Sequence, residues 1–270
     1  GMLLDVKELR GGYGGGDVVR GVSFRANAGE VVFLAGPNGC GKTTLLRLLL
    51  GRLPASGGSI RVDGNPLEAL RPRALASLLA YIPQQHTPIF AYTALEVVLM
   101  GRASHFSAFE SPKAADRDAA FAALERLGAA HLASRSCLSL SGGQRQMVLI
   151  ARAVCQNAKI FLMDEPAASL DYANQRLLLD TAEALAREGR CVVMSTHSPE
   201  HPFAVGNKVL LMRGGKAAAF GPPGEVITPR TLEKVYGVEM DVLTVEDRYG
   251  RKRTVCLPVR QADSRPWRRC

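Results

Sequence analysis

The chain has 270 residues, of which 47% are hydrophobic and 22% charged, and its formal net charge at pH 7 is +9. This length and apolar content are ample for one large α/β domain or two small ones. No stretch reaches the about 18 consecutive apolar residues of a membrane-spanning helix, and the N-terminus lacks the pattern of a signal peptide. We therefore expect a cytosolic protein, for which any role at a membrane depends on a separate membrane subunit.

The six cysteines include no C-x-x-C pair and no nearby histidine at zinc-ligand spacing. This favours reduced, buried thiols over a zinc site. Much of the excess positive charge lies near the C-terminus, between residues 248 and 269. Such a tail is either simply solvated or lies near anionic lipid headgroups. Because no nucleic-acid-binding motif is recognisable, no nucleic-acid partner is expected.

The first elements in chain order are predicted strands. Residues 3–9 partly alternate, and residues 18–19 and 22–24 suggest a further pair of strands before a turn at 27–29. Between them, residues 11–16 read GGYGGG and predict a flexible turn. The single aromatic residue there, Tyr13, either stacks on an adenine ring or is an ordinary surface tyrosine, and its spacing does not decide between the two.

Residues 36–43 read GPNGCGKT and fit the phosphate-binding loop G-x-x-x-x-G-K-[ST]. An apolar run at 31–35 predicts a buried strand before the loop, and helix-forming residues at 45–50 predict a helix after it. Glycines let the backbone wrap closely around a polyphosphate, and the helix N-terminus adds its positive dipole. Lys42 can reach the β- and γ-phosphates, and the Thr43 hydroxyl can ligate Mg²⁺. We therefore predict a nucleotide site here.

The middle of the chain is predicted to be mostly helical. After a short strand at 59–64, residues 67–80 predict a helix interrupted at Pro72, and residues 80–83 a strand that leads to Gln84. Thr93 and Glu96 form a capping-box pattern that opens a helix, and residues 113–127 predict another. Residues 87 to about 136 therefore form a helical block inserted between two α/β halves.

Residues 140–146 read LSGGQRQ and precede a helix, for which Ser141 is well placed as N-cap. The exposed N–H groups of this first turn could contact a second anion, although a plain loop-to-helix start explains the pattern equally well. Further on, residues 160–163 are apolar and predict a buried strand that ends at Asp164 and Glu165. Parallel strands point such acids at the edge where phosphate loops lie. There Asp164 can hold Mg²⁺ through water, and Glu165 can polarise an attacking water molecule.

Residues 191–197 repeat the layout of a buried strand that ends in polar residues, and His197 at its end could donate a hydrogen bond to a γ-phosphate. A helix is expected from about 173 to 188. Two hairpins are expected later, one around residues 213–215 and one around residues 247–250. The last residues, from 261 to 270, have a disordered composition.

In this order, the motifs resemble the ATP-binding subunit of an ABC transporter over residues 2 to about 225. The resemblance implies a P-loop NTPase (RecA-like) α/β core with an antiparallel β subdomain and an inserted helical subdomain at about 87–136. The ATPase domain then covers residues 1–228, and residues 229–270 are a short C-terminal extension with a basic tail.

The resemblance assigns a function to each motif. Catalytic roles fall to Glu165 as general base, His197 as switch histidine, Gln84 in the Q-loop and Asp171 in the D-loop. The metal ligands would be Thr43, Gln84 and Asp164. The nucleotide-binding residues would be Tyr13, Gly36, Pro37, Asn38, Gly39, Cys40, Gly41, Lys42, Thr43 and Thr44, with Ser141, Gly142, Gly143 and Gln144 of the segment LSGGQ at residues 140–144, which matches the family's signature motif.

The family also implies ATP and Mg²⁺ as cofactors and a head-to-tail homodimer with two ATP molecules at its interface. In that dimer Ser141 and Gly143 of one subunit contact the γ-phosphate held by Lys42 of the other. Integral membrane permease subunits would dock near residues 84–105 at the cytoplasmic face of a prokaryotic inner or plasma membrane. A solute-binding protein would act indirectly.

Residues 93–102 and 171–175 resemble importers of iron-siderophore, haem, cobalamin and related metal chelates, and molybdate or tungstate importers share the first stretch. Because this subunit does not touch the cargo, the cargo stays open among these. A second hypothesis is a soluble ABC ATPase that acts on ribosomes or DNA. Against it, the chain has room for one cassette only and carries no heptad run. The signature disfavours a nucleotide kinase or GTPase, and an exporter would often carry fused membrane helices.

Overall fold

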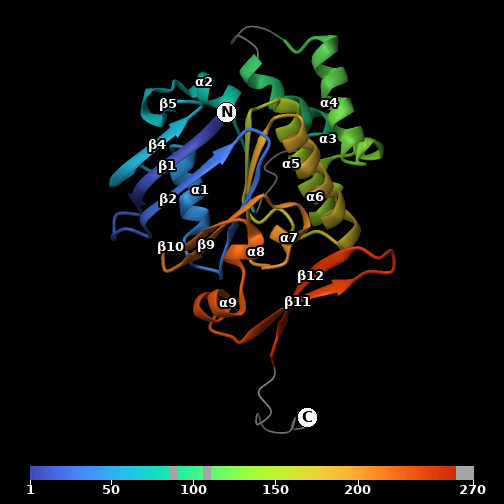
Figure 1. Ribbon diagram of the computed structural model, residues 1–270. Coiled ribbons are helices and arrows are strands. Elements are labelled where there is room, and N and C mark those ends of the chain that lie inside the picture. Colours follow the sequence, from blue (N-terminus) through green and yellow to red (C-terminus); the bar gives the residue numbers. More distant parts are fainter. Residues whose placement is uncertain (85–90, 106–110, 260–270) are drawn as a thin grey trace, which may run out of the picture.

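The computed structural model describes residues 1–84, 91–105 and 111–259, which form two main sheets and one hairpin sheet (Figure 1). The first sheet is antiparallel in the order β2-β1-β4-β5, and the second has the order β10-β9-β3-β8-β7-β6. Its strands from β9 to β6 are parallel, and β10 pairs antiparallel to β9.

The strands of the antiparallel sheet are β1 (Met2–Gly11), β2 (Val19–Asn27), β4 (Gly57–Val62) and β5 (Asn65–Pro66). Those of the second sheet are β3 (Val31–Ala35), β6 (Leu79–Ile82), β7 (Ile160–Met163), β8 (Cys191–Thr196), β9 (Lys208–Arg213) and β10 (Lys216–Gly221). The hairpin consists of β11 (Met240–Glu246) and β12 (Lys252–Pro258), as the sequence predicted.

The helices are α1 (Lys42–Leu49), α2 (Pro72–Leu78), α3 (Ala94–Leu99), α4 (Ala114–Arg126), α5 (Gly142–Gln156), α6 (Tyr172–Arg187), α7 (His201–Val205), α8 (Pro223–Val226) and α9 (Pro229–Tyr236). Short 3-10 segments occur at Leu67–Ala69, Met100–His105, Ala130–Leu132 and Cys137–Ser139. The predicted capping box of α3 is present, because Thr93 Oγ1 accepts the Glu96 N–H and the Glu96 carboxylate accepts the Thr93 N–H.

Two predictions about local structure were wrong. The two short strands expected at 18–19 and 22–24 are one strand, β2, in which Gly21 has a φ of +82°. Leu9 pairs with Val22 and Arg10 with Arg20, so Gly21 is the extra residue of a β-bulge rather than a break between strands.

The second error is the helix expected over residues 67–80. It is a 3-10 turn followed by α2, and the chain already enters β6 at Leu79. Pro72 opens α2 instead of interrupting a longer helix, because proline is tolerated at the first helical position. Leu79 and Ala80 pair with Ile160 and Phe161 of β7, and this tertiary pairing overrides their helix propensity.

The parallel sheet has a core on each face, because successive residues of its strands point to opposite sides. Val32 and Leu34 of β3 face α1 and the antiparallel sheet, whereas Phe33 and Ala35 face α5 and α6. α1 therefore lies between the two sheets, with Leu45, Leu46, Leu48 and Leu49 buried. This burial fixes the loop that leads into α1.

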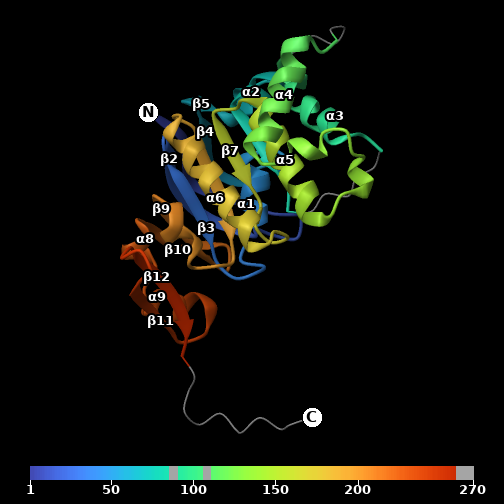
Figure 2. The same cartoon turned by 90° about the vertical axis from the view of Figure 1, so that its right-hand side faces the viewer.

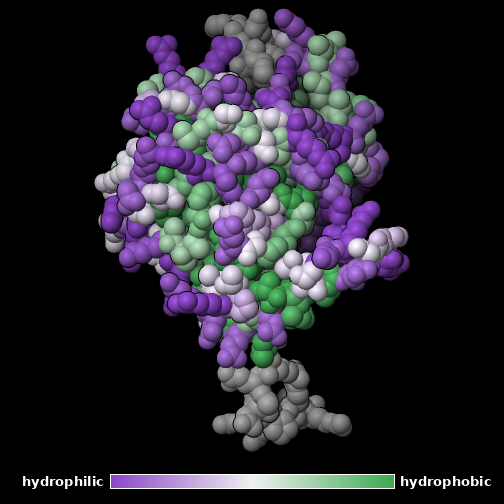
Figure 3. Space-filling view, in the orientation of Figure 1, coloured by the Kyte–Doolittle hydropathy of each residue, from purple (hydrophilic) through white to green (hydrophobic). Residues whose placement is uncertain are grey.

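α3 and α4 pack against α5 and project at one end of the molecule, and the β11–β12 hairpin lies at the other end (Figures 1 and 2). Hydrophobic surface gathers near the base of the hairpin, whereas the α4 end mixes hydrophilic and weakly hydrophobic residues (Figure 3). Within the part of the chain that the structure describes, no helix combines the length and the apolar character needed to cross a membrane. Residues 260–270, which include the last part of the basic tail, residues 87–90 of the predicted helical block and residues 106–110 lie outside the described residues.

Candidate functional site

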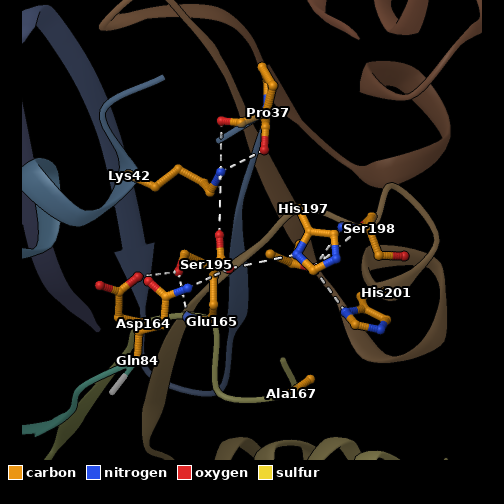
Figure 4. Close-up of polar contacts among 12 residues, drawn as sticks. Pro37, Lys42, Gln84, Asp164, Glu165, Ala167, Ser195, His197, Ser198 and His201 are labelled. Atoms are coloured by element: carbon orange, nitrogen blue, oxygen red, sulfur yellow. Dashed lines mark hydrogen bonds and ion pairs between the residues drawn. The ribbon is translucent and has the colours of Figure 1, made fainter. Parts of the chain in front are cut away.

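The candidate site lies at the carboxyl ends of three neighbouring parallel strands, β3, β8 and β7. β3 leads into the predicted phosphate loop, β7 ends just before Asp164, and β8 is followed directly by His197. Parallel pairing brings these ends to one edge of the sheet, although the three segments are far apart in sequence. Figure 4 shows that their side chains converge there.

The backbone of the phosphate loop requires glycine at positions 36, 39 and 41, each of which has a positive φ. Gly36 has a φ of +153°, and a Cβ there would collide with the Met212 carbonyl and with the Cys40 sulfur. Gly41 has a φ of +107° and is the N-cap of α1. A residue with a Cβ is strained at such positive φ values, so the close wrap of the loop depends on glycine at these positions.

Lys42 is buried at the start of α1 and directs its ammonium group back into the loop. Its Nζ donates to the carbonyl oxygens of Gly36 at 2.6 Å and Pro37 at 3.0 Å, and lies 3.7 Å from Glu165 Oε1. A buried cation is thereby held by carbonyl dipoles and one carboxylate. Cys40, also buried, lies 3.8 Å from the same Nζ, and burial raises the pKa of its thiol, so it stays protonated.

Asp164 is fixed from both sides. Its Oδ2 accepts the Thr43 hydroxyl at 2.9 Å and its Oδ1 accepts the Ser195 hydroxyl at 2.9 Å, while its own N–H donates to Ile82 O. Asp164 is 2% exposed, so a carboxylate there requires these donors. The result is a pair of hard oxygens, from Thr43 and Asp164, side by side at the mouth of the phosphate loop.

Glu165 is the point on which the site converges. Its Oε2 accepts the Gln84 amide at 3.0 Å and lies 3.7 Å from His197 Nδ1, while Oε1 faces Lys42 (Figure 4). Its backbone has a φ of +42°, a left-handed conformation that is uncommon for a residue other than glycine. The Glu165 N–H donates to Ser195 Oγ at 2.7 Å, which holds this conformation. Strained backbone of this kind is typical of functional sites.

The loop after β8 is ordered by its own hydroxyl and imidazole groups. Thr196 Oγ1 accepts the Ser198 N–H at 3.0 Å and contacts His201 Nδ1 at 2.9 Å. Burial lowers the pKa of His201, and the neighbouring His197 lowers it further, so its imidazole is neutral at pH 7. The His197 side chain is 60% exposed.

Tyr13 lies against the outer face of α1 rather than free in solvent. Arg47 donates to its hydroxyl at 2.7 Å and places its guanidinium 5.7 Å from the ring centroid. The ring is half exposed, so a planar ligand can still reach it.

The residues of the LSGGQ segment form a separate, local arrangement. Ser141 is the N-cap of α5, as predicted: its Oγ accepts the Gln144 N–H at 3.1 Å, and Gln144 Oε1 accepts the Ser141 N–H at 3.0 Å. Ser141 and Gly142 are exposed, and Gly143 comes close to the Ser169 carbonyl in the segment before Asp171. Asp171 caps α6 by accepting the Asn174 N–H at 2.8 Å. Both helix starts therefore lie on one surface and present exposed polar groups.

Sequence reasoning missed Ser195, Thr196 and His201. Ser195 joins Asp164 to the Glu165 backbone, and Thr196 and His201 order the loop that carries His197. Their signal was present, because hydroxyl residues at the end of an otherwise apolar strand must find partners. The partners of these hydroxyl groups depend on which strand lies beside β8, and the sequence alone does not show which strand that is.

Comparison with known proteins decides the family. The family model described as "ABC transporter" matches residues 19–168, more than half of the chain. This chain belongs to the ABC transporter family. The hemin import ATP-binding protein of Myxococcus xanthus is 36% identical over 90% of this chain and 92% of its own length. The molybdate import ATP-binding protein of Haemophilus influenzae is 38% identical over 81% of each chain.

A solved structure, a metal-chelate type ABC transporter in an inward-facing conformation, superposes with a TM-score of 0.86 at 34% identity. The superposition covers 97% of this chain and 99% of the chain in the solved structure. The protein is thus an ATP-binding, ATP-hydrolysing subunit of an ABC transporter of the importer type. The predicted P-loop NTPase fold is confirmed.

Proposed function

We propose that this ABC ATPase drives uptake of a metal chelate by hydrolysing ATP between two copies of the chain, at the cytoplasmic face of a membrane. The observation that carries the proposal is the convergence of Lys42, Gln84 and His197 on Glu165. A carboxylate surrounded by donors from three elements is suited to accept a proton beside a bound γ-phosphate.

In this proposal Glu165 acts as the general base. Gln84 holds one carboxylate oxygen and leaves the other to take the proton of the attacking water. The water oxygen forms the new bond to the γ-phosphorus as the bond to the ADP oxygen breaks, so the products are ADP and phosphate. Lys42 and His197 donate to the phosphate oxygens and offset their growing negative charge.

The oxygens of Thr43 and Asp164 fit Mg²⁺, because they are hard donors already placed together by a 2.9 Å hydrogen bond. Gln84 would add an amide oxygen. Bound there, Mg²⁺ would neutralise phosphate charge and orient the β- and γ-phosphates. Tyr13 would stack on the adenine, with Arg47 keeping the ring in place.

The second half of each ATP site comes from the other copy. The start of α5 is capped, and its positive dipole end faces solvent; it consists of Ser141, Gly142, Gly143 and Gln144. This helix end suits a γ-phosphate that approaches from outside the monomer. Asp171, on the same surface, would align the water across the interface. Such a dimer excludes bulk solvent from the site while it keeps the attacking water, as a lid does in other enzymes.

The partners we propose are two permease subunits, which dock near residues 84–105, and a solute-binding protein on the far side of the membrane. The names of the relatives, hemin and molybdate import, and the metal-chelate type neighbour support an importer for a metal chelate such as an iron-siderophore or haem, with molybdate or tungstate as the second candidate. No nucleic-acid partner is proposed.

Two experiments test this function. The Glu165→Gln variant should dimerise with Mg²⁺-ATP in size-exclusion chromatography, and Glu165→Gln combined with Ser141→Arg should stay monomeric; equal dimerisation of the two would contradict the head-to-tail interface.

For the cargo, the complex with the permease and binding protein encoded beside its gene is reconstituted in vesicles. Uptake of a ferric siderophore or haem supports the proposal, and uptake of molybdate alone overturns the choice of cargo.

A further inference from the structure

Two contacts join the C-terminal segment, which we define as residues 229–258, to the loop that carries His197. The Tyr236 hydroxyl donates to the His197 carbonyl oxygen at 3.4 Å. The Cys256 N–H donates to Glu200 Oε1 at 2.9 Å. The segment therefore contacts both ends of the loop formed by residues 197–200.

The C-terminal segment is itself held firmly by the main core. Leu232 and Val235 of α9 and Cys256 of β12 are buried in the same hydrophobic cluster as Val209 and Leu211 of β9. α9 starts with Pro229 at its first position and a capping box between Thr228 and Thr231. Tyr236, the last residue of α9, thus extends from a rigid element and not from a loose tail.

The Tyr236 hydroxyl lies between the phosphate loop and the His197 loop. Burial raises its pKa well above the ordinary value for tyrosine, and Cys40 and Cys256 raise it further, whereas the Gly36 backbone N–H lowers it. The hydroxyl is therefore protonated throughout the working pH range and remains a hydrogen-bond donor.

The loop has few other constraints at His197. Its internal hydrogen bonds centre on Thr196, and the His197 side chain is 60% exposed. The position of the His197 backbone sets the region that the imidazole can reach, and in this structure its Nδ1 lies 3.7 Å from Glu165 Oε2. A contact that holds the His197 carbonyl therefore limits where the imidazole can lie relative to Glu165.

We propose that the C-terminal segment positions His197 for hydrolysis, with Tyr236 and the Glu200–Cys256 hydrogen bond as its two anchors. The inference rests on the proposed role of His197 at the γ-phosphate. Tyr236 is a positioning residue, because it acts through the His197 backbone. The segment that the sequence predicted as a short C-terminal extension then has a defined part in the ATPase cycle.

The test compares Tyr236→Phe with Tyr249→Phe in the full chain. Both remove one hydroxyl from the C-terminal segment, but Tyr249 is 76% exposed in the hairpin turn. A hydrogen bond is worth about 0.5–1.5 kcal/mol, so Tyr236→Phe should lower kcat about three- to tenfold while KM for ATP stays near the parent value and the free energy of unfolding falls by no more than about 1.5 kcal/mol. Tyr249→Phe should leave kcat unchanged. An unchanged kcat in Tyr236→Phe, or a raised KM with kcat intact, would overturn the inference.

A second measurement reports on His197 directly. The imidazole resonances in ¹⁵N-histidine-labelled protein are assigned by the signal lost in His197→Ala, and that signal should move in Tyr236→Phe but not in Tyr249→Phe. A lower kcat with an unmoved His197 signal would contradict positioning through His197. If His197→Ala itself hydrolyses ATP at the parent rate, the proposed role of His197 fails, and this result is distinct from a failure of Tyr236 alone.

The other anchor offers a matched pair of variants. Glu200→Ala removes the acceptor of the Cys256 N–H, whereas Glu200→Gln keeps an acceptor oxygen. We expect Glu200→Ala to lower kcat about two- to fivefold and Glu200→Gln to restore most of the loss, since the alanine variant loses the acceptor of one hydrogen bond and the glutamine variant keeps it. If Glu200→Ala and Glu200→Gln hydrolyse ATP at equal rates, the Glu200–Cys256 hydrogen bond does not help to position His197.

Discussion

The edge of the parallel sheet and the N-terminus of α5 both present groups suited to phosphate, but they are built in opposite ways. At the sheet edge, Thr43 meets Asp164 across 121 residues of sequence and Gln84 meets Glu165 across 81. At α5, Ser141 and Gln144 satisfy each other across three residues, with Ser141 exposed and Gln144 half-buried. The first arrangement exists only when the whole domain is folded, whereas the second needs one turn of helix. In the sheet edge, then, chemistry and stability depend on the same residues, and at α5 they can be separated.

The largest expected effect is on chemistry at the sheet edge. Glu165→Gln keeps the shape of the side chain but removes the base, so kcat should fall about 10²- to 10⁴-fold while ATP still binds. Phosphate release and equilibrium binding of a fluorescent ATP analogue measure the two quantities. Glu188→Gln, which changes an exposed carboxylate paired with Arg126, is the control and should keep the parent rate. Parent-rate hydrolysis by Glu165→Gln would show that another group takes the proton.

Lys42→Ala should weaken ATP binding about 10- to 100-fold, because a charge-assisted hydrogen bond to phosphate is worth about 1.5–3 kcal/mol. Titration calorimetry measures the affinity. Lys159→Ala serves as the matched control, since Lys159 precedes β7 at the opposite end of the strand and pairs with Asp63. An unchanged affinity for ATP in Lys42→Ala would show that the lysine does not bind the phosphates.

Ser195→Ala tests whether the sheet edge couples stability to chemistry. The variant leaves the buried Asp164 carboxylate and the Glu165 N–H each without one partner, so the free energy of unfolding should fall by about 1.5–3 kcal/mol. Hydrolysis should fall as well. Urea denaturation gives the first value, with the exposed Ser139→Ala expected within about 0.5 kcal/mol of the parent. A stable but inactive Ser195→Ala would contradict the coupling.

At α5 the two effects should separate. Ser141→Ala removes the N-cap and should lower the free energy of unfolding by about 1 kcal/mol, whereas Ser141→Asn keeps a capping oxygen and should not. Both should hydrolyse ATP more slowly, since both change the group offered to the other copy. Urea denaturation and phosphate release distinguish these results, and a fully active Ser141→Asn would exclude a role for the hydroxyl across the interface.

The smallest effect expected is a pH dependence from His201. Burial lowers its pKa in the folded state, so the unfolded chain binds the proton more readily. Stability is therefore fully present above the ordinary pKa of about 6.5 and is lost as pH falls from there toward the folded-state value. Urea denaturation between pH 7.5 and 5 should show a smaller pH slope in His201→Asn than in the parent. Identical slopes would rule out His201 as the source.

The parts predictable from the sequence were those with a local cause. The phosphate-loop glycines, the caps at Thr93 and Ser141, and the acids after an apolar strand depend on neighbours within a few residues. The bulge at Gly21, the Ser195 contacts and the Tyr236 contact depend on segments far away in sequence. Hydrophobic periodicity does not give the register of one strand against another, so these features could not be predicted.

The left-handed backbone of Glu165 also has an evolutionary consequence. A residue other than glycine pays roughly 1–2 kcal/mol for that conformation. Selection for thermostability alone would therefore favour glycine or asparagine at position 165, and each such replacement would discard the carboxylate on which the site converges. When variants of this chain are selected for heat resistance without a growth requirement for transport, position 165 should be the first place at which ATP hydrolysis is lost.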